Sequence, residues 1–166
     1  MTTNLRNNIV SAAHLKVMTF AFDNFVGENS QGLEKGKIKL MTGDSNLLFQ
    51  ATSGLPGFQT LNSSSQKSKG RIPTCSQAKI TNYFVKTKPV YLPHVKGVNG
   101  NFYPIVPFAV FVGKYQRSDL GVHKDTNVPG SSGCLVITLD DHWNLYEIEM
   151  LKLANQGITQ ISLIVS

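Results

Sequence analysis

The chain has 166 residues, of which 41% are hydrophobic and 16% charged, with a formal net charge of +6 at pH 7. This composition predicts one globular domain, 1–166, large enough to bury a core without metal or disulfides, with 1–35 as an N-terminal extension of that domain. No apolar run approaches the length of a membrane span and no internal repeat is present, which excludes a membrane-spanning protein and a repeat protein.

Alternation of apolar and polar residues dominates the first half of the chain. It predicts a strand over 15–22 and a hairpin over 37–53 that turns at 43–45. Residues 54–73, rich in Gly, Ser, Lys and Gln, predict a long mobile loop, for which a functional element and plain disorder are equal alternatives. Residues 78–92 predict a strand followed by an edge strand, because prolines bracket the second apolar run.

The second half holds the most apolar strands and one helix. Residues 105–112 and 134–139 predict the central strands that carry the site, and 158–165 predict a last strand. A stretch without proline or glycine predicts a helix over 142–155. The apolar stripe expected to pack in the core is Trp143, Tyr146, Met150, Leu153 and Ala154.

The helix has signals at both ends. Asp140 or Asp141 is the expected N-cap, and Gly157 is the expected residue that ends the helix. The predicted fold class is therefore mainly β: a β-sandwich or mixed sheet with one main helix near the C-terminus.

The most informative stretch places His123 eleven positions before Cys134. A turn-rich segment joins the two, and small residues, Ser131-Ser132-Gly133, precede the cysteine. A cysteine attacks as its thiolate, and a neighbouring imidazole can take the thiol proton. Alone, such a cysteine is usually a buried small hydrophobe and such a histidine a packed polar residue. Together they predict a nucleophile and a base within hydrogen-bond reach of each other.

The pattern G-[IVL]-H followed by S-x-G-C-[ILV] resembles the active-site signature of the L,D-transpeptidase catalytic domain, a family of cysteine enzymes that act on peptidoglycan stem peptides. The resemblance implies that Cys134 is the nucleophile, His123 the base and Gly133 the glycine before the nucleophile. Ser132 stands where the family usually has a second histidine, and Val136 where it usually has arginine. The spacing from histidine to cysteine is also shorter, so the chain resembles a divergent branch.

The resemblance extends over about residues 36–166, through 37–54 and 100–110, and implies an L,D-transpeptidase-like fold. It implies attack by the Cys134 thiolate on a stem-peptide carbonyl, with main-chain N–H groups of 132–134 holding the oxyanion. Water or an amine then resolves the thioester. We expect a peptidoglycan-cleaving peptidase of the phage endolysin type. The alternatives are a cross-linking L,D-transpeptidase and a catalytically idle cell-wall-binding module, and a reactive thiol of low pKa would favour an enzyme over the idle module.

Four further residues are candidates for substrate binding. Arg117 could bind a substrate carboxylate, with a surface salt bridge as the equal alternative. Asp125 could orient His123 or meet the amine of a stem-peptide diamino acid, although a turn-forming aspartate is the commoner role. Tyr103, with Tyr115, could line a groove, with packing as the default.

No metal, cofactor or disulfide is expected. The histidines at 14, 94, 123 and 142, with Asp125, lack the tight spacing of a metal site. Cys75 lies in a Pro- and Ser-containing segment and is expected to be a structural loop residue, not a disulfide partner of Cys134.

The basic charge is spread along the chain, and the cluster over 67–71 is expected to be a solvated loop. We therefore expect a monomer attracted to an anionic envelope, whose partner is the peptidoglycan stem peptide and not nucleic acid. Residues 1–14 lack the apolar core of an export signal. The expected location is the host cytoplasm and then the cell wall for a phage product, and otherwise the periplasm or cell wall.

Overall fold

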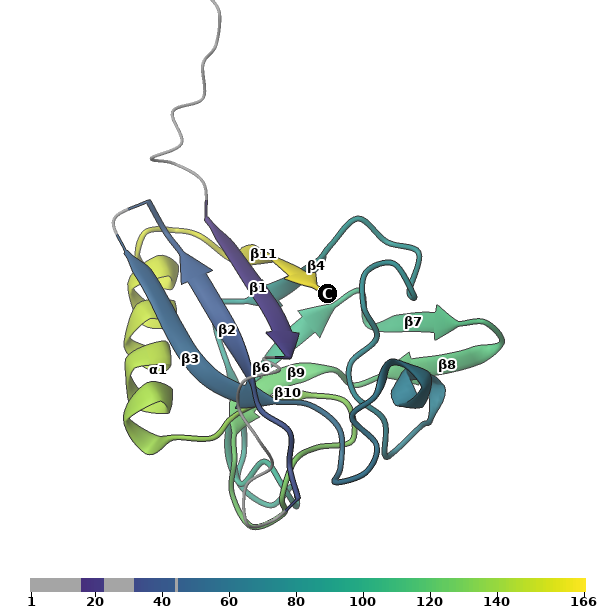
Figure 1. Ribbon diagram of the computed structural model, residues 1–166. Coiled ribbons are helices and arrows are strands. Elements are labelled where there is room, and N and C mark those ends of the chain that lie inside the picture. Colours follow the sequence, from purple (N-terminus) through teal and green to yellow (C-terminus); the bar gives the residue numbers. More distant parts are fainter. Residues whose placement is uncertain (1–15, 23–31, 44) are drawn as a thin grey trace, which may run out of the picture.

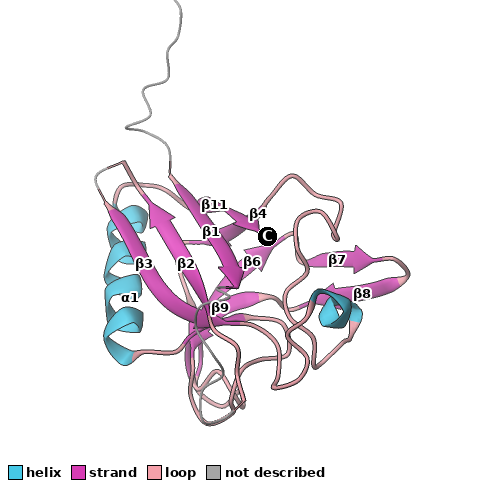
Figure 2. Cartoon of the chain, in the orientation of Figure 1, coloured by secondary structure: helices cyan, strands magenta, loops and turns pink. Residues whose placement is uncertain are grey.

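The computed structural model describes residues 16–22, 32–43 and 45–166, which form strands and one α-helix, α1 (Figures 1 and 2). The bounds are β1 Val17–Phe22, β2 Gly36–Met41, β3 Asn46–Thr52, β4 Tyr83–Lys86, β5 Val90–Leu92, β6 Gly100–Val106, β7 Ala109–Val112, β8 Tyr115–Ser118, β9 Gly121–Lys124, β10 Leu135–Ile137, α1 Asp140–Asn155 and β11 Gln160–Val165.

The main sheet closes into a barrel. Its strands follow the order β4-β11-β1-β2-β3-β10-β9-β6, and β6 pairs again with β4, while β5 extends the sheet as an edge strand beside β6. The sheet is mixed, because the pairs β1–β11 and β9–β10 are parallel and the others antiparallel. The predicted mainly β class with one helix near the C-terminus is confirmed. Of the two predicted arrangements, a β-sandwich and a mixed sheet, the structure has the mixed sheet.

The first strand is part of this barrel. β1 lies between β11 and β2 and pairs with both along nearly its whole length. Its inward side chains Met18 and Phe20 are fully buried in the core. The region predicted as an N-terminal extension therefore contributes a barrel strand. Residues 1–15 and 23–31 lie outside the described part of the chain.

Aromatic side chains join α1 to the barrel. Figure 1 shows α1 lying alongside β3, and Tyr146 on this helix meets Phe49 of β3 edge-to-face at 5.6 Å between ring centroids. Tyr103 of β6 packs against Trp143 and Tyr146 at 5.8 and 5.2 Å. Edge-to-face pairs add about 1 kcal/mol each beyond the burial of their area. This packing fixes the helix that follows β10, one of the two strands that position the site.

The helix starts earlier than predicted. It begins at Asp140, and its N-cap residue is Leu139, which makes no side-chain capping bond. The predicted aspartate cap is therefore wrong. Asp140 and Asp141 instead lie in the first turn, where their negative charge interacts favourably with the positive end of the helix dipole. Gly157, at φ +81°, ends the helix as predicted. In the described ranges no helix is long and apolar enough to cross a membrane.

The predicted strand over 105–112 is divided in two. β6 ends at Val106, and the following Pro107 has no N–H to continue the ladder. The chain then leaves the barrel, and β7 pairs with β8 in a separate two-stranded sheet (Figure 2). The other strand predicted to be central is confirmed, because β10 is buried throughout and lies between β3 and β9.

The loop over 54–73 is a folded element, which differs from the mobile loop that its composition predicts. Main-chain hydrogen bonds from Leu55 to Lys69 (2.8 Å) and from Arg71 to Phe58 (3.1 Å) join its two arms. A short 3₁₀ turn, η2 Leu61–Ser65, lies between the arms and buries Ser64. We call residues 54–73 the folded loop.

Candidate functional site

Two adjacent parallel strands bring His123 and Cys134 to one place. β9 ends with His123 and Lys124, and Cys134 comes directly before β10. In the ladder Leu135 lies opposite Val122 and Val136 opposite His123. Both side chains line the same cavity, of about 690 Å³. The register places both residues on one cavity, and the ten residues between them, 124–133, only have to turn back along the sheet.

The cavity is walled mainly by apolar side chains. Two charged residues, Lys96 and Asp119, line it. Its large apolar lining residues are Leu55, Val90, Leu92, Val95, Val98, Phe102, Ile105, Val106, Phe108, Leu120 and Val128. Such a site holds a ligand mostly by excluding water, and a few polar groups set its orientation.

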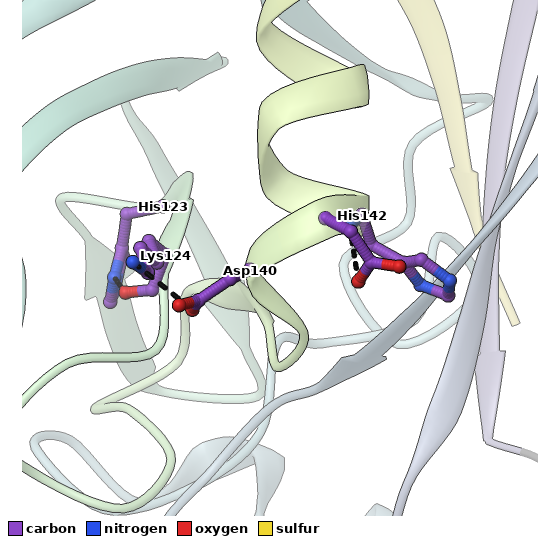
Figure 3. Close-up of polar contacts among 5 residues, drawn as sticks. His123, Lys124, Asp140 and His142 are labelled. Carbon is purple, nitrogen blue, oxygen red and sulfur yellow. Dashed lines mark hydrogen bonds and ion pairs between the residues drawn. The ribbon is translucent and has the colours of Figure 1, made fainter.

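His123 is held in one tautomer by the main chain. Its side chain is buried, and Nδ1 lies 2.8 Å from the main-chain oxygen of Lys124 (Figure 3). A carbonyl oxygen only accepts, so Nδ1 carries the proton in the neutral ring and Nε2 keeps its lone pair. The ring of Phe102 stacks on the imidazole with 6.2 Å between centroids. Burial lowers the pKa of His123, so Nε2 is an unprotonated base at neutral pH.

The Cys134 thiol is protonated in the resting protein. The sulfur lies among apolar walls, and this burial raises the pKa of Cys134 to about 12; a main-chain hydrogen bond from Gly121 and the charge of Arg117 oppose the rise. Sγ donates to the main-chain oxygen of Asp119 at 3.6 Å. Within the described residues no hydrogen bond joins Sγ to His123. At rest the cavity therefore holds a neutral thiol and a neutral imidazole, not the low-pKa thiol that we expected of an enzyme.

The loop that carries Cys134, the candidate nucleophile, is Ser131–Cys134, and it is braced from inside. Ser131 is buried, and its Oγ donates to the Cys134 oxygen at 2.6 Å and accepts from the Gly133 N–H at 3.3 Å. The Gly133 N–H is thus engaged, which removes it from the predicted donors to an oxyanion. Ser132 is exposed and lines the cavity. We call these four residues the nucleophile loop.

Arg117 is not a ligand for a substrate carboxylate, and it is not on the surface. Its side chain is 2% exposed and donates four hydrogen bonds to main-chain oxygens. A guanidinium so engaged has little left to offer a ligand. The sequence left a substrate carboxylate and a surface salt bridge as equal alternatives for Arg117, whereas its observed partners are main-chain oxygens of two other segments.

The other three candidates for substrate binding, Tyr103, Tyr115 and Asp125, do not line the cavity that holds Cys134. Tyr103 is 3% exposed and packs between the aromatic rings of α1, away from the cavity. Tyr115 is exposed on β8 and lines a separate hollow. Asp125 does not orient His123, because the Lys124 oxygen does so; its Oδ1 is buried with no hydrogen-bond partner among the described residues.

The structure adds site residues that the sequence did not indicate. The Lys124 oxygen and Asp119 act through the main chain, which no side-chain pattern reports. Asp119 has φ +58°, an uncommon conformation for a residue other than glycine, and it directs its oxygen to the thiol. Phe102 reaches His123 only through the β6–β9 register. The glycine two residues before His123 was the one sequence feature that pointed to Phe102. Any side chain at Gly121 would collide with the Phe102 ring.

The remaining histidines and cysteines form no second centre in the described ranges. There the structure contains no group of three or more His, Cys, Asp or Glu placed to hold a metal. His142 accepts from the Gln50 N–H at 2.9 Å, on the far side of Asp140 from His123 (Figure 3). Cys75 and Cys134 are both free, and Cys75 is buried where its sulfur accepts from the Val165 N–H. His14 lies outside the described residues.

Comparison with protein-family models, with curated proteins and with solved structures finds no match to this chain.

A cysteine mechanism that uses His123 as its base would have a characteristic pH dependence. In such a mechanism His123 must be neutral to accept the proton, so kcat/KM should fall only on the acid side, at a pH below the ordinary pKa of histidine, because burial lowers the pKa of His123. Because the pKa of Cys134 is about 12, its alkylation by iodoacetamide should keep accelerating above about pH 9. A plateau in alkylation by about pH 7 would indicate a preformed thiolate–imidazolium pair and contradict this state.

Asp125 should influence stability and not turnover. Burial raises its pKa from 3.8 to about 6, so between those values the folded protein binds more protons than the unfolded chain, and stability falls as pH rises. We expect Asp125→Asn to raise the melting temperature at about pH 8 and to leave it unchanged at about pH 4. Melting curves at both pH values test this. Loss of turnover in Asp125→Asn would contradict this prediction and indicate that Asp125 has a role in the site.

Proposed function

We propose that the protein is a cysteine-dependent acyl-transfer enzyme that acts on peptidoglycan stem peptides, with hydrolysis as the principal outcome. The observation that carries the proposal is the thiol of Cys134 on the same apolar cavity as a histidine held with Nε2 as a free base. The motif's resemblance to the L,D-transpeptidase catalytic domain supplies the substrate class. An enzyme with this substrate acts at the cell wall.

The first half-reaction joins the acyl group to the protein. Sγ of Cys134 attacks the stem-peptide carbonyl carbon while its proton passes to Nε2 of His123. The carbon–nitrogen bond then breaks, and the imidazolium gives its proton to the leaving amine. A thioester remains on Cys134. Transfer of the proton during attack suits this site, because the thiol is not ionised beforehand.

The second half-reaction releases the acyl group. For hydrolysis, Nε2 takes a proton from water, the oxygen attacks the thioester, and the proton returns to Sγ as the carbon–sulfur bond breaks. Hydrolysis needs no second binding site. The departures at Ser132 and Val136 from the pattern of the L,D-transpeptidases favour a changed acceptor.

Cross-linking transpeptidation is the second candidate, and one side chain favours it. The exposed carboxylate of Asp119 lines the cavity beside the thiol and can pair with the ammonium group of an acceptor. Lys96, the cation on the cavity wall, is the candidate partner for a stem-peptide carboxylate in place of Arg117. An idle wall-binding module is favoured only by the high pKa of Cys134.

Mass spectrometry of purified stem peptides after incubation separates these functions. Shortened stems indicate hydrolysis, and exchange of the terminal residue for an added amino acid indicates transpeptidation. Cys134→Ala is the matched control for any contaminating peptidase. Peptides left unchanged by the wild-type protein at high enzyme concentration would contradict both enzymatic functions. The wall-binding module would then be the remaining candidate function.

A further inference from the structure

Arg117 connects three segments that are distant in sequence. It projects from β8, and Nη1 donates to the main-chain oxygens of Ser64 and of Arg71, the latter at 3.1 Å. Nη2 donates to the oxygens of Gly70 and Ser132, both at 3.0 Å. Three of these oxygens belong to the folded loop. The fourth belongs to the nucleophile loop, two residues before Cys134.

Gly133 is shaped around this guanidinium. A Cβ at Gly133 would collide with Nη2 of Arg117 and would also lie 3.3 Å from Leu120. Gly133 has φ +124°, a conformation that side chains rarely adopt. The glycine before the nucleophile is thus required by close approach of the arginine as well as by the turn.

The guanidinium also places a fixed positive charge near the sulfur. Arg117 favours the charged form of Cys134, against the larger effect of burial. An arginine retains its charge even when buried, so this influence persists at every working pH. Within the nucleophile loop Ser131 braces Cys134, and from outside Arg117 holds Ser132.

We propose that Arg117 is a positioning residue for the nucleophile: it clamps the nucleophile loop to the folded loop and so fixes where the Cys134 sulfur lies. The arginine itself does not touch substrate. The proposal rests on the proposed function for its kinetic consequence, but the reactivity of the Cys134 thiol reports on it without any substrate.

The rival role for Arg117 is purely structural, in which it only satisfies buried carbonyls. Arg71 offers the matched control. It is also buried, at 4% exposure, and it donates to the main-chain oxygens of Ile72 and Ser166, with its guanidinium 4.6 Å from the Phe22 ring centroid. Among the described residues, its side chain makes no hydrogen bond to the nucleophile loop.

The test compares Arg117→Lys, Gly133→Ala and Arg71→Lys. Lysine is chosen because it keeps a charge and three donors, whereas an apolar residue would leave four carbonyls without a donor. For each variant we would measure the melting temperature, the pH profile of Cys134 alkylation by iodoacetamide, and kcat and KM for a synthetic stem peptide, well below the melting temperature.

We expect Arg117→Lys and Gly133→Ala to lower kcat by about 10- to 100-fold with KM within about twofold, because a small displacement of a nucleophile costs rate and not binding. The alkylation profile of Arg117→Lys should move to higher pH, since the shorter side chain withdraws charge from the sulfur. Arg71→Lys should lower the melting temperature but keep the wild-type kcat and alkylation profile.

An unchanged alkylation profile and kcat in folded Arg117→Lys would overturn the proposal. So would equal losses of kcat in Arg71→Lys and Arg117→Lys, because that would reveal a general effect of a buried arginine. A shifted alkylation profile in a protein whose wild-type form turns over no stem peptide would support the clamp and reject the proposed function.

Discussion

Cys134→Ala should lower turnover of stem peptides by more than about 10⁴-fold while the protein remains folded, because the attacking atom is lost and nothing else in the cavity can form the thioester. The side chain is small and half-buried, so its removal leaves little empty space. Peptide products followed by mass spectrometry, with a melting curve for the same sample, measure both effects.

The second cysteine provides the matched control for this substitution. Cys75 is 8% exposed, its sulfur accepts from the Val165 N–H at 3.3 Å, and it does not line the cavity. Cys75→Ala should therefore lower the melting temperature and keep turnover. Cleavage of stem peptides by Cys134→Ala at the wild-type rate would contradict the cysteine mechanism.

His123→Gln should lower kcat by about 10³-fold, because general acid–base catalysis by a positioned side chain contributes about that factor. The loss should be large here, since the pKa of the thiol is about 12 and little thiolate forms without a base. The alkylation profile of Cys134 should change little, because the resting thiol donates to Asp119 and not to His123.

His142→Gln is the control for His123→Gln. His142 accepts from the Gln50 N–H and packs near the Phe49 ring, which is a structural role between α1 and β3. The variant should be less stable and still active. Equal kinetic losses in both histidine variants would mean that His123 acts through the fold and not as the base.

The sequence predicted that His123 and Cys134 lie at one site, and both line one cavity, but it did not predict their surroundings. His123 and Cys134 could be found because imidazole and thiol are rare and the small residues before Cys134 have a steric meaning. The partner of His123 could not be found, because it is the main-chain oxygen of Lys124. The partners of Arg117 could not be found either, because they are main-chain oxygens of the folded loop and of Ser132, whereas the sequence offered only a substrate carboxylate or a surface salt bridge.

The fold shows the same division. The alternation of apolar and polar residues and the apolar stripe of α1 predicted a mainly β domain with one helix. Local sequence patterns are sufficient for that prediction. Closure of the sheet depends on the pairing of β6 with β4, which no local pattern contains. Tyr103 illustrates the consequence, since its strand was predicted but the face it occupies, toward Trp143 of α1, was not.

Capture of the acyl-enzyme tests the proposed mechanism most directly. A stem peptide is mixed with the protein, the reaction is stopped in acid within its first turnover, and the intact protein is analysed by mass spectrometry. The mechanism predicts a mass increase equal to the acyl part of the peptide, located on the fragment that contains Cys134 and absent from Cys134→Ala. Turnover of the peptide with no such adduct, or an adduct that persists in Cys134→Ala, would contradict it.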